Sequence, residues 1–218
     1  MNWELPAEAY TCQDCGKCTS VCPVARTGLG YSPRRFIQQA LRKGTDEALW
    51  DRSIFACLGC DRCTQVCKSG ISITDLILEL RARAYAQGVP AQPAHFGILQ
   101  SLMRLQAASK TPQNRLDWVD STLKLSDHSA VLYFVGCAPY FDSVFRHLDV
   151  DPLRTARNAV RLLNHVGVKP ILLRDERCCG HDLLWQGDVA NFRKLAERNL
   201  AQIRASGART VVLSLIHI

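Results

Sequence analysis

CQDCGKCTSVCP, at residues 12–23, recurs as CLGCDRCTQVCK at residues 57–68. Both stretches have the spacing Cys-x2-Cys-x2-Cys-x3-Cys, so the chain contains an internal repeat. Three cysteines at intervals of three positions can wrap a short loop around one face of a metal cluster, while the fourth leaves in another direction. Zinc sites also use Cys-x2-Cys units, often with histidine, but each motif here has a third cysteine in phase and no histidine nearby. The repeat therefore favours iron–sulfur clusters over zinc.

The composition is consistent with metal binding by cysteine. The chain has 218 residues, of which 11 are cysteine, and a formal net charge of +7. We find neither an apolar run long enough to span a membrane nor a signal-peptide pattern at the first residues. Without export, thiols stay reduced, and an odd number of cysteines cannot all be paired, so a disulfide scaffold is disfavoured. Because no lysine-rich run or arginine–aromatic pattern occurs, we expect no nucleic-acid binding.

The spacing is that of bacterial ferredoxins, in which the fourth cysteine of each run ligates the other cluster. Applied to this sequence, that rule predicts two [4Fe-4S] clusters with crossed ligands. The first is expected to take Cys12, Cys15, Cys18 and Cys67. The second is expected to take Cys57, Cys60, Cys63 and Cys22. Pro23 follows the first motif, whereas Lys68 stands at the matching place in the second, a departure that removes no ligand.

Each motif is followed by a predicted helix. The first begins with Ser32 as N-cap and Pro33 at the first helical position, and Gly44 is expected to end it. The second begins with a capping-box-like Ser72 and Asp75. A β-hairpin ferredoxin has no room for the residues between the motifs, so residues 1–90 resemble an α-helical ferredoxin domain like that of succinate dehydrogenase iron–sulfur subunits.

Residues 91–129 are expected to form a linker and a helical connector, with an apolar face from Phe96 to Leu105 that packs on a neighbouring domain or lies on a membrane surface. From residue 130 strands and helices alternate. We predict strands at 130–135, 169–173 and 210–213 and helices at 151–167 and 188–207, which implies a parallel sheet. The fold class is therefore α + α/β, with domains at 1–90 and 130–218 joined by 91–129.

The remaining cysteines follow the predicted strands. Cys137 comes after the first, and Cys178-Cys179-Gly180 comes after the second. Ligands of open parallel sheets bind beyond the carboxyl ends of the strands, so these three cysteines form a tentative third metal site. A lone buried structural cysteine is the competing interpretation of Cys137. His181 is a candidate hydrogen-bond donor beside this site or a structural residue.

Two ferredoxin motifs followed by Cys137 and Cys178-Cys179-Gly180 resemble heterodisulfide reductase subunits with their cysteine-rich "CCG" domain. The iron–sulfur subunits of glycolate oxidase and anaerobic glycerol-3-phosphate dehydrogenase are related. Residues 12–23 and Tyr31-Ser-Pro-Arg-Arg35 are similar to the C-type segment, and the later cysteines to the B- or D-type segment. In that family the CCG motif ends with Cys-x2-Cys, and its spacing falls on Leu215 and Ile218. We therefore expect a truncated reading frame in which Leu215–Ile218 is not native sequence; a degenerate third site is the alternative.

The resemblance implies an electron-transfer subunit of a heterodisulfide reductase-like oxidoreductase. It would pass electrons through two [4Fe-4S] clusters toward the CCG site, where a third iron–sulfur cluster would form in the complete domain. The alternative is a non-catalytic carrier that links a flavin dehydrogenase to quinone. The implied partners are a flavoprotein or iron–sulfur subunit and a membrane quinone-linked subunit. The expected location is the cytoplasm or the inner face of the membrane.

Overall fold

The computed structural model describes residues 5–28, 30–43, 51–89, 91–108, 110 and 113–213. It divides into two compact units, which we treat separately. Unit 1 comprises Met1–Gln100 together with Asp182–Val189, and unit 2 comprises Ser101–His181 together with Ala190–Ile218. The sequence did not predict that residues 182–189, which follow the last cysteines, would pack within the unit that carries the two ferredoxin-like motifs.

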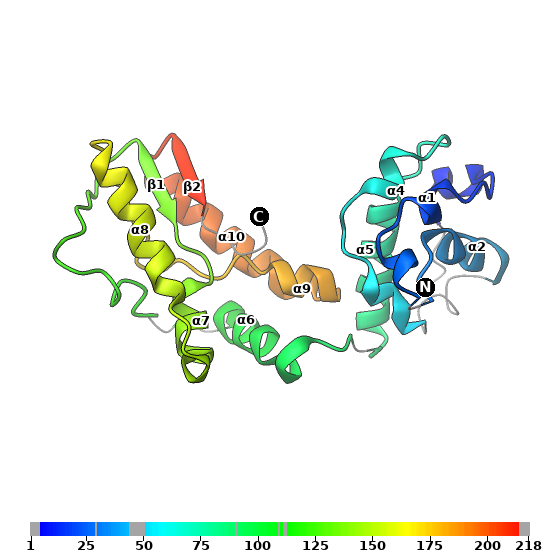
Figure 1. The fold of residues 1–218 in the computed structure, drawn as a ribbon, viewed down its shortest axis with the longest axis horizontal. Helices are drawn as coiled ribbons and strands as arrows, with labels where there is room; N and C mark the ends of the chain where they lie inside the picture. The colour runs from blue at the N-terminus through cyan, green and yellow to red at the C-terminus, as the bar shows by residue number, and fades with distance from the viewer. Residues whose placement is uncertain are drawn as a thin grey trace. The chain divides into compact units, whose positions relative to one another are not determined.

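Unit 1 is built from short helices around the two motifs (Figure 1). Its 3-10 helices are Ala7–Thr11, Val24–Thr27, Arg52–Ala56 and Ala94–Gly97. Its α-helices are α1 (Lys17–Ser20), α2 (Pro33–Lys43), α4 (Arg62–Gln65) and α5 (Ile73–Ala86). The division between the units at Gln100 falls in α6 (Ile98–Ala108), and α9 (His181–Gln186) begins at the corresponding later division.

The sequence repeat is also a repeat of backbone conformation. A 3-10 helix ends just before Cys12, and another ends just before Cys57. In the first motif Asp14 and Gly16 have left-handed φ angles of 53° and 76°, and the residues at the matching positions of the second motif do the same. α1 and α4 then start at equivalent residues. Aspartate and glycine are among the residues that tolerate this region, so both loops can turn tightly enough to bring successive cysteines to one side.

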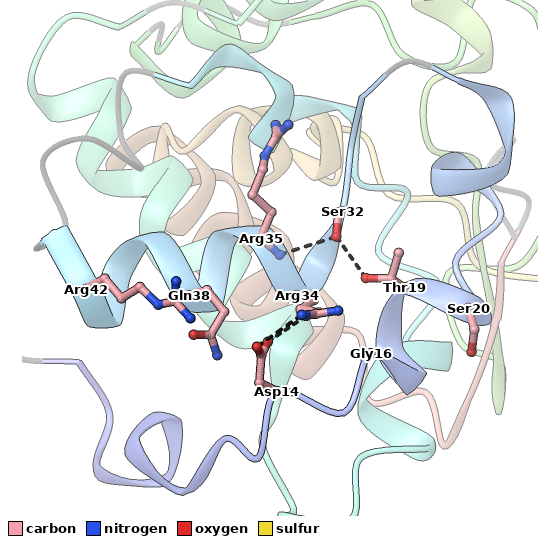
Figure 2. Close-up of a pocket in the computed structure, with 9 residues that line it drawn as sticks. All are labelled: Asp14, Gly16, Thr19, Ser20, Ser32, Arg34, Arg35, Gln38 and Arg42. Atoms are coloured by element: carbon pink, nitrogen blue, oxygen red, sulfur yellow. Dashed lines mark hydrogen bonds and ion pairs between the residues drawn. The ribbon is translucent and has the colours of Figure 1, made fainter.

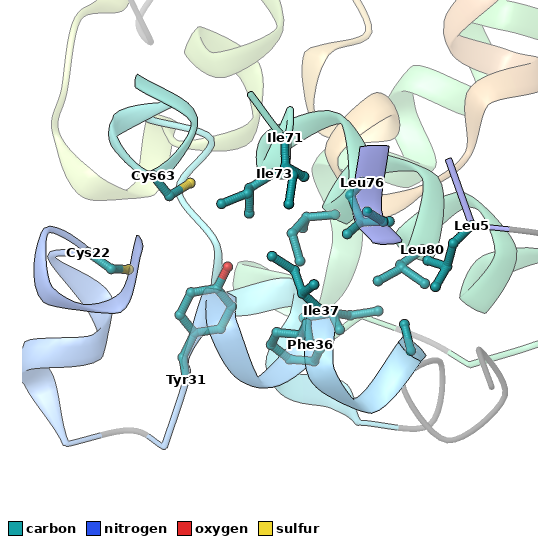
Figure 3. Close-up of a cluster of buried hydrophobic side chains, with 14 of the residues drawn as sticks. Leu5, Cys22, Tyr31, Phe36, Ile37, Cys63, Ile71, Ile73, Leu76 and Leu80 are labelled. Atoms are coloured by element: carbon teal, nitrogen blue, oxygen red, sulfur yellow. The ribbon is translucent and has the colours of Figure 1, made fainter. Parts of the chain in front are cut away.

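The two longer helices of unit 1 bury an apolar core between them (Figure 3). Phe36 and Ile37 of α2 and Leu76 and Leu80 of α5 are at most 2% exposed. Figure 3 shows Cys22, Cys63 and Tyr31 together on one side of this core. The helices that follow the motifs thus provide the apolar wall behind the cysteine loops.

The predicted helix starts are correct, but one cap differs. The Ser32 hydroxyl accepts a hydrogen bond from the Arg35 N–H, as an N-cap should. Ser72 instead donates to the carboxylate of Asp75. The first N–H groups of α5, those of Ile73 and Thr74, are bonded by the Thr64 hydroxyl from the second motif. This cap ties α5 directly to the cysteine loop. Gly44, expected to end α2, lies outside the described residues.

Unit 2 contains the predicted parallel pairing. Strand β1 (Val131–Phe134) pairs in parallel with β2 (Thr210–Leu213), with Val131 opposite Thr210. The expected strand at 169–173 is wrong as a strand, because only Ile171 pairs with β1, through a single bridge to Leu132. Two hydrogen bonds hold this bridge: the Tyr133 N–H donates to the Ile171 carbonyl, and the Ile171 N–H donates to the Val131 carbonyl. The segment passes beside β1 and departs before a ladder can form.

Helices cover both faces of β1, as Figure 1 shows for α8 and α10. Tyr133 and Val135 pack with α8 on one face, while Leu132 and Phe134 pack with Ile203 of α10 on the other. The α-helices of this unit, besides part of α6, are α7 (Ala138–Val144), α8 (Pro152–His165) and α10 (Val189–Ala205), and its 3-10 helix is Arg146–Leu148. The α + α/β class is therefore correct. No helix in the described part of the chain is long and apolar enough to cross a membrane.

The core beneath α8 predicts a clear contrast between two leucines of that helix. Leu153 is 8% exposed and packs in the core, whereas Leu162 is 67% exposed. We expect Leu153→Ala to lower the free energy of unfolding by about 2–5 kcal/mol, because it leaves a cavity. The control Leu162→Ala should change it by no more than about 0.5 kcal/mol. Chemical denaturation measures both, and equal losses would contradict this packing.

Candidate iron–sulfur and cysteine sites

The first cysteine cavity lies at the loop of the first motif. Residues of the loop, of α2 and of the segment that follows the second motif surround it. Its walls include the apolar side chains of Ile37, Ile71 and Ile73. Four cysteines line it, three from the first motif and one from the second: Cys12, Cys15, Cys18 and Cys67. The chain therefore brings a cysteine from the far motif to the near one.

The second cysteine cavity is arranged in the reciprocal way. It is walled by Val24, Tyr31 and Leu58 among others. The cysteines that line it are three from the second motif and one from the first: Cys57, Cys60, Cys63 and Cys22. Each cavity thus collects the four thiols that the ferredoxin rule assigns to one cluster, although the ligand sets themselves remain a prediction.

The donors at these cavities fit an iron–sulfur cluster. Sulfur ligands dominate both, and no histidine lines either one in the described part of the chain. Soft thiolates are the ligands that such clusters use. Burial raises the pKa of the Cys18 and Cys63 thiols above the ordinary range. Metal binding must displace those protons, so cluster assembly is coupled to proton release.

A second, more open hollow adjoins the first cavity (Figure 2). Arg34 of α2 forms two hydrogen bonds to the Asp14 carboxylate, with N···O distances of 2.5 and 3.0 Å. Gln38, also on α2, donates from its Nε2 to the Cys12 sulfur at 3.5 Å. The ion pair is half exposed, so it fixes the loop without burying a charge.

The third cysteine group is gathered in unit 2. The sulfur atoms of Cys137, Cys178 and Cys179 all lie within 4.8 Å of one another. The Cys137 and Cys178 sulfurs are 3.6 Å apart, and both side chains are buried. Hydrogen bonds with Cys178 and Cys179, together with burial, raise the pKa of the Cys137 thiol. Three converging thiols can hold one metal ion and leave a fourth position open.

A buried ion pair positions this group. Glu176 accepts hydrogen bonds from the N–H groups of Val135 and Gly136, at 3.0 and 2.6 Å, just before Cys137. Arg115 donates to the same carboxylate at 2.5 Å and to the Gly136 carbonyl at 2.7 Å. Glu176 and Arg115 are 1% and 3% exposed. The pair therefore fastens the end of β1 to the segment that carries Cys178.

A second set of polar contacts holds Cys178 itself. The side chain of Asn199 on α10 accepts from the Arg177 N–H and donates to the Arg177 and Cys178 carbonyls. The Gln106 side chain of α6 accepts the Cys178 N–H at 2.8 Å. Sequence reasoning missed all of these positions. Arg115 lies in a segment without periodicity, and the one available signal was a carboxylate two residues before the Cys-Cys pair.

Other polar residues lie at or near these sites. His181 is partly buried at the start of α9. Lys17 and Lys68 line the first cavity, and Arg62 lines the second. Leu215 and Ile218, where the resemblance places a further Cys-x2-Cys, lie outside the described residues.

Comparison with known proteins finds matches for both cysteine-bearing regions of the chain. Residues 8–71 match the 4Fe-4S dicluster domain, and residues 131–215 match the cysteine-rich domain called CCG. The D-type subunit of the dihydromethanophenazine:CoB–CoM heterodisulfide reductase of Methanosarcina mazei is 28% identical over 94% of this chain and 54% of its own length. The C-type subunit of the ferredoxin/F420H2-dependent CoB–CoM heterodisulfide reductase of Methanosarcina acetivorans is 44% identical over 38% of this chain and 50% of its own length. An uncharacterized iron–sulfur protein of Methanococcus maripaludis is 25% identical over 87% of this chain and 38% of its own length.

The fold and these matches define an iron–sulfur protein with a dicluster domain followed by a cysteine-rich domain. Within that class the chain is similar to the D-type and C-type subunits of heterodisulfide reductases. It spans about half the length of these D-type and C-type relatives.

The buried ion pair gives a stability prediction. Glu176→Gln removes the charge that faces Arg115, so we expect the free energy of unfolding to fall by about 3–5 kcal/mol. The matched control Glu197→Gln, on the exposed side of α10, should change it by no more than about 0.5 kcal/mol. Denaturant unfolding of the metal-free protein tests this, and a neutral Glu176→Gln would refute a positioning role for the pair.

Proposed function

We propose that this chain is the electron-transfer part of a heterodisulfide reductase-like oxidoreductase. It would hold two [4Fe-4S] clusters in unit 1 and pass electrons toward the three cysteines of unit 2. The observation that carries the proposal is the pair of cavities, each lined by three cysteines of one motif and the fourth of the other. When bound, the clusters supply one-electron redox chemistry, and the chain supplies ligand geometry, burial and hydrogen bonds to sulfur.

The residues of unit 1 support that role in two ways. The isoleucines at the first cavity, together with the core behind both loops, keep water from the inner side of the thiols. In addition, Gln38 donates to the Cys12 sulfur, and the Gly59 N–H donates to the Cys57 sulfur at 3.4 Å. Such hydrogen bonds adjust the reduction potential of a cluster.

For unit 2 we propose a metal-dependent step on a disulfide. Reducing a disulfide takes two electrons and two protons and gives two thiols. Cys137, Cys178 and Cys179 supply three ligands, which leaves room for a substrate sulfur at the metal. We further propose that a flavoprotein or iron–sulfur partner delivers the electrons. A pure carrier that hands electrons to a quinone-linked partner is the outcome if unit 2 shows no disulfide chemistry.

The two clusters can be tested by metal analysis. Anaerobically purified protein should contain about eight irons in unit 1, and its reduced form should show two magnetically interacting clusters by electron paramagnetic resonance. Protein that takes up zinc and no iron on anaerobic reconstitution would end the proposal.

Crossed ligation has its own test. Cys67→Ser should disturb the cluster bound by Cys12, Cys15 and Cys18, because Cys67 lines that cavity. Its reciprocal control, Cys22→Ser, should disturb the cluster bound by the second motif. Paramagnetic resonance distinguishes the two once Cys15→Ser and Cys60→Ser have assigned the signals. If each variant instead damages the cluster of its own motif, the crossed sets are wrong.

The proposed chemistry of unit 2 can be separated from electron transfer. Reduced protein mixed with the CoB–CoM heterodisulfide should release thiols in a single turnover, and Cys178→Ser should abolish the release while the signals of both clusters persist. Thiol assay and paramagnetic resonance on the same samples measure the two properties. Equal thiol release by wild type and Cys178→Ser would favour the carrier.

A further inference from the structure

Arg81 is a buried cation that contacts the second cysteine loop. It lies on α5 and is 2% exposed. Its Nη2 donates to the carbonyls of Ile54 and Cys57, both at 2.8 Å, and its Nε donates to the Ile54 carbonyl at 3.0 Å. Its Nη1 donates to the Trp185 carbonyl at 3.2 Å. Within the described part of the chain, these acceptors are all carbonyl oxygens and none is a carboxylate.

Two aromatic rings shield this guanidinium. Its carbon atom lies 5.7 Å from the centre of the Phe55 ring and 5.4 Å from that of Trp185. Trp185 also packs so closely on Gly59 that a Cβ atom there would come within 2.0 Å of the indole. A tryptophan from the 182–189 segment thus covers the second cysteine loop and keeps water from Arg81.

A buried cation without a counter-ion is costly. Burial lowers the pKa of Arg81, while the neighbouring Cys57 thiolate raises it. A cluster bound by four thiolates carries net negative charge, and it would lie next to the carbonyl of Cys57 that Arg81 bonds. The negative charge of a cluster at this loop would therefore offset the free-energy cost of burying the Arg81 cation.

The first cavity has no buried cation among the described residues. Three cations line it: Arg34 is half exposed and forms an ion pair with Asp14, and Lys17 and Lys68 are exposed. Between their first and fourth cysteines the two motifs carry the same charges, Asp14 and Lys17 in the first and Asp61 and Arg62 in the second, and Lys68 follows the second. The buried charge of Arg81 is what distinguishes the second loop.

We infer that Arg81 is the internal counter-ion of the cluster held by Cys57, Cys60, Cys63 and Cys22, and that it raises the reduction potential of this cluster above that of the other. The inference rests on the ligand sets proposed above. A reduced cluster carries one more negative charge than an oxidised one, so a nearby cation in a low-dielectric setting favours the reduced form. An electron that exchanges between the two clusters would therefore reside mainly on the second, which has the higher reduction potential.

The test is a potentiometric titration followed by paramagnetic resonance, with the signals assigned through Cys15→Ser and Cys60→Ser. In the unmodified chain the signal sensitive to Cys60→Ser should be reduced first. Arg81→Gln should lower the ratio of reduced to oxidised second cluster about tenfold at a fixed potential, equivalent to about 59 mV for one electron. Arg81→Lys should keep the wild-type value because it keeps the charge.

Arg83→Gln is the matched control, because it removes the same charge from the same helix, and Arg83 is paired with Glu79 on the surface. It should leave both potentials unchanged. The inference is overturned if the Cys15-sensitive signal has the higher potential, or if iron-loaded Arg81→Gln keeps the wild-type potential. If Arg81→Gln fails to fold, the order in which the two clusters of the unmodified chain are reduced still tests the inference. Protein without clusters would instead refute the proposed function.

Discussion

The convergence of cysteines from two distant motifs is the constraint on which unit 1 depends. Cys67 must reach the loop of residues 12–18, and Cys22 must reach the loop of residues 57–63. Helix α2 follows the first motif and α5 follows the second, and the two helices pack in one apolar core with residues of both cysteine loops. The apolar core between these helices therefore also sets the shape of both cavities.

The two copies of the motif are alike in backbone and unequal in surroundings. Matching left-handed residues and matching helix starts give both loops the same shape. The side chains around them differ: one loop is held by an exposed Arg34–Asp14 pair, and the other by the buried Arg81 under Trp185. The repeated motif therefore gives both cysteine loops the same backbone geometry, while the neighbouring elements determine the electrostatic surroundings of each loop.

In unit 2, buried polar groups hold the two cysteine-bearing segments in place. Its three cysteines come from two segments that meet at the end of β1, and Glu176, Arg115 and Asn199 bond the backbone on both sides of that junction. Buried networks of this kind favour one arrangement, because each lost contact leaves a polar group without a partner. The Arg115 Nε and Nη1 nitrogens are buried and make no hydrogen bond within the described part of the chain. The reliance on bonds to backbone explains why few sequence signals mark the site.

The sequence by itself determined what depends on neighbours along the chain. Cysteine spacing indicated the loops, the cap at Ser32 predicted the start of α2, and the alternation of strands and helices placed α8 at 151–167. Two of three strands were also predicted correctly, because β1 and β2 are short apolar runs bounded by turns. Only the tertiary structure decided the rest. It reduced the segment around Ile171 to a bridge and placed Trp185 on the loop at Gly59. It also buried Arg81 and Glu176, whose roles depend on groups far away in sequence, and no local pattern encodes contacts of that kind.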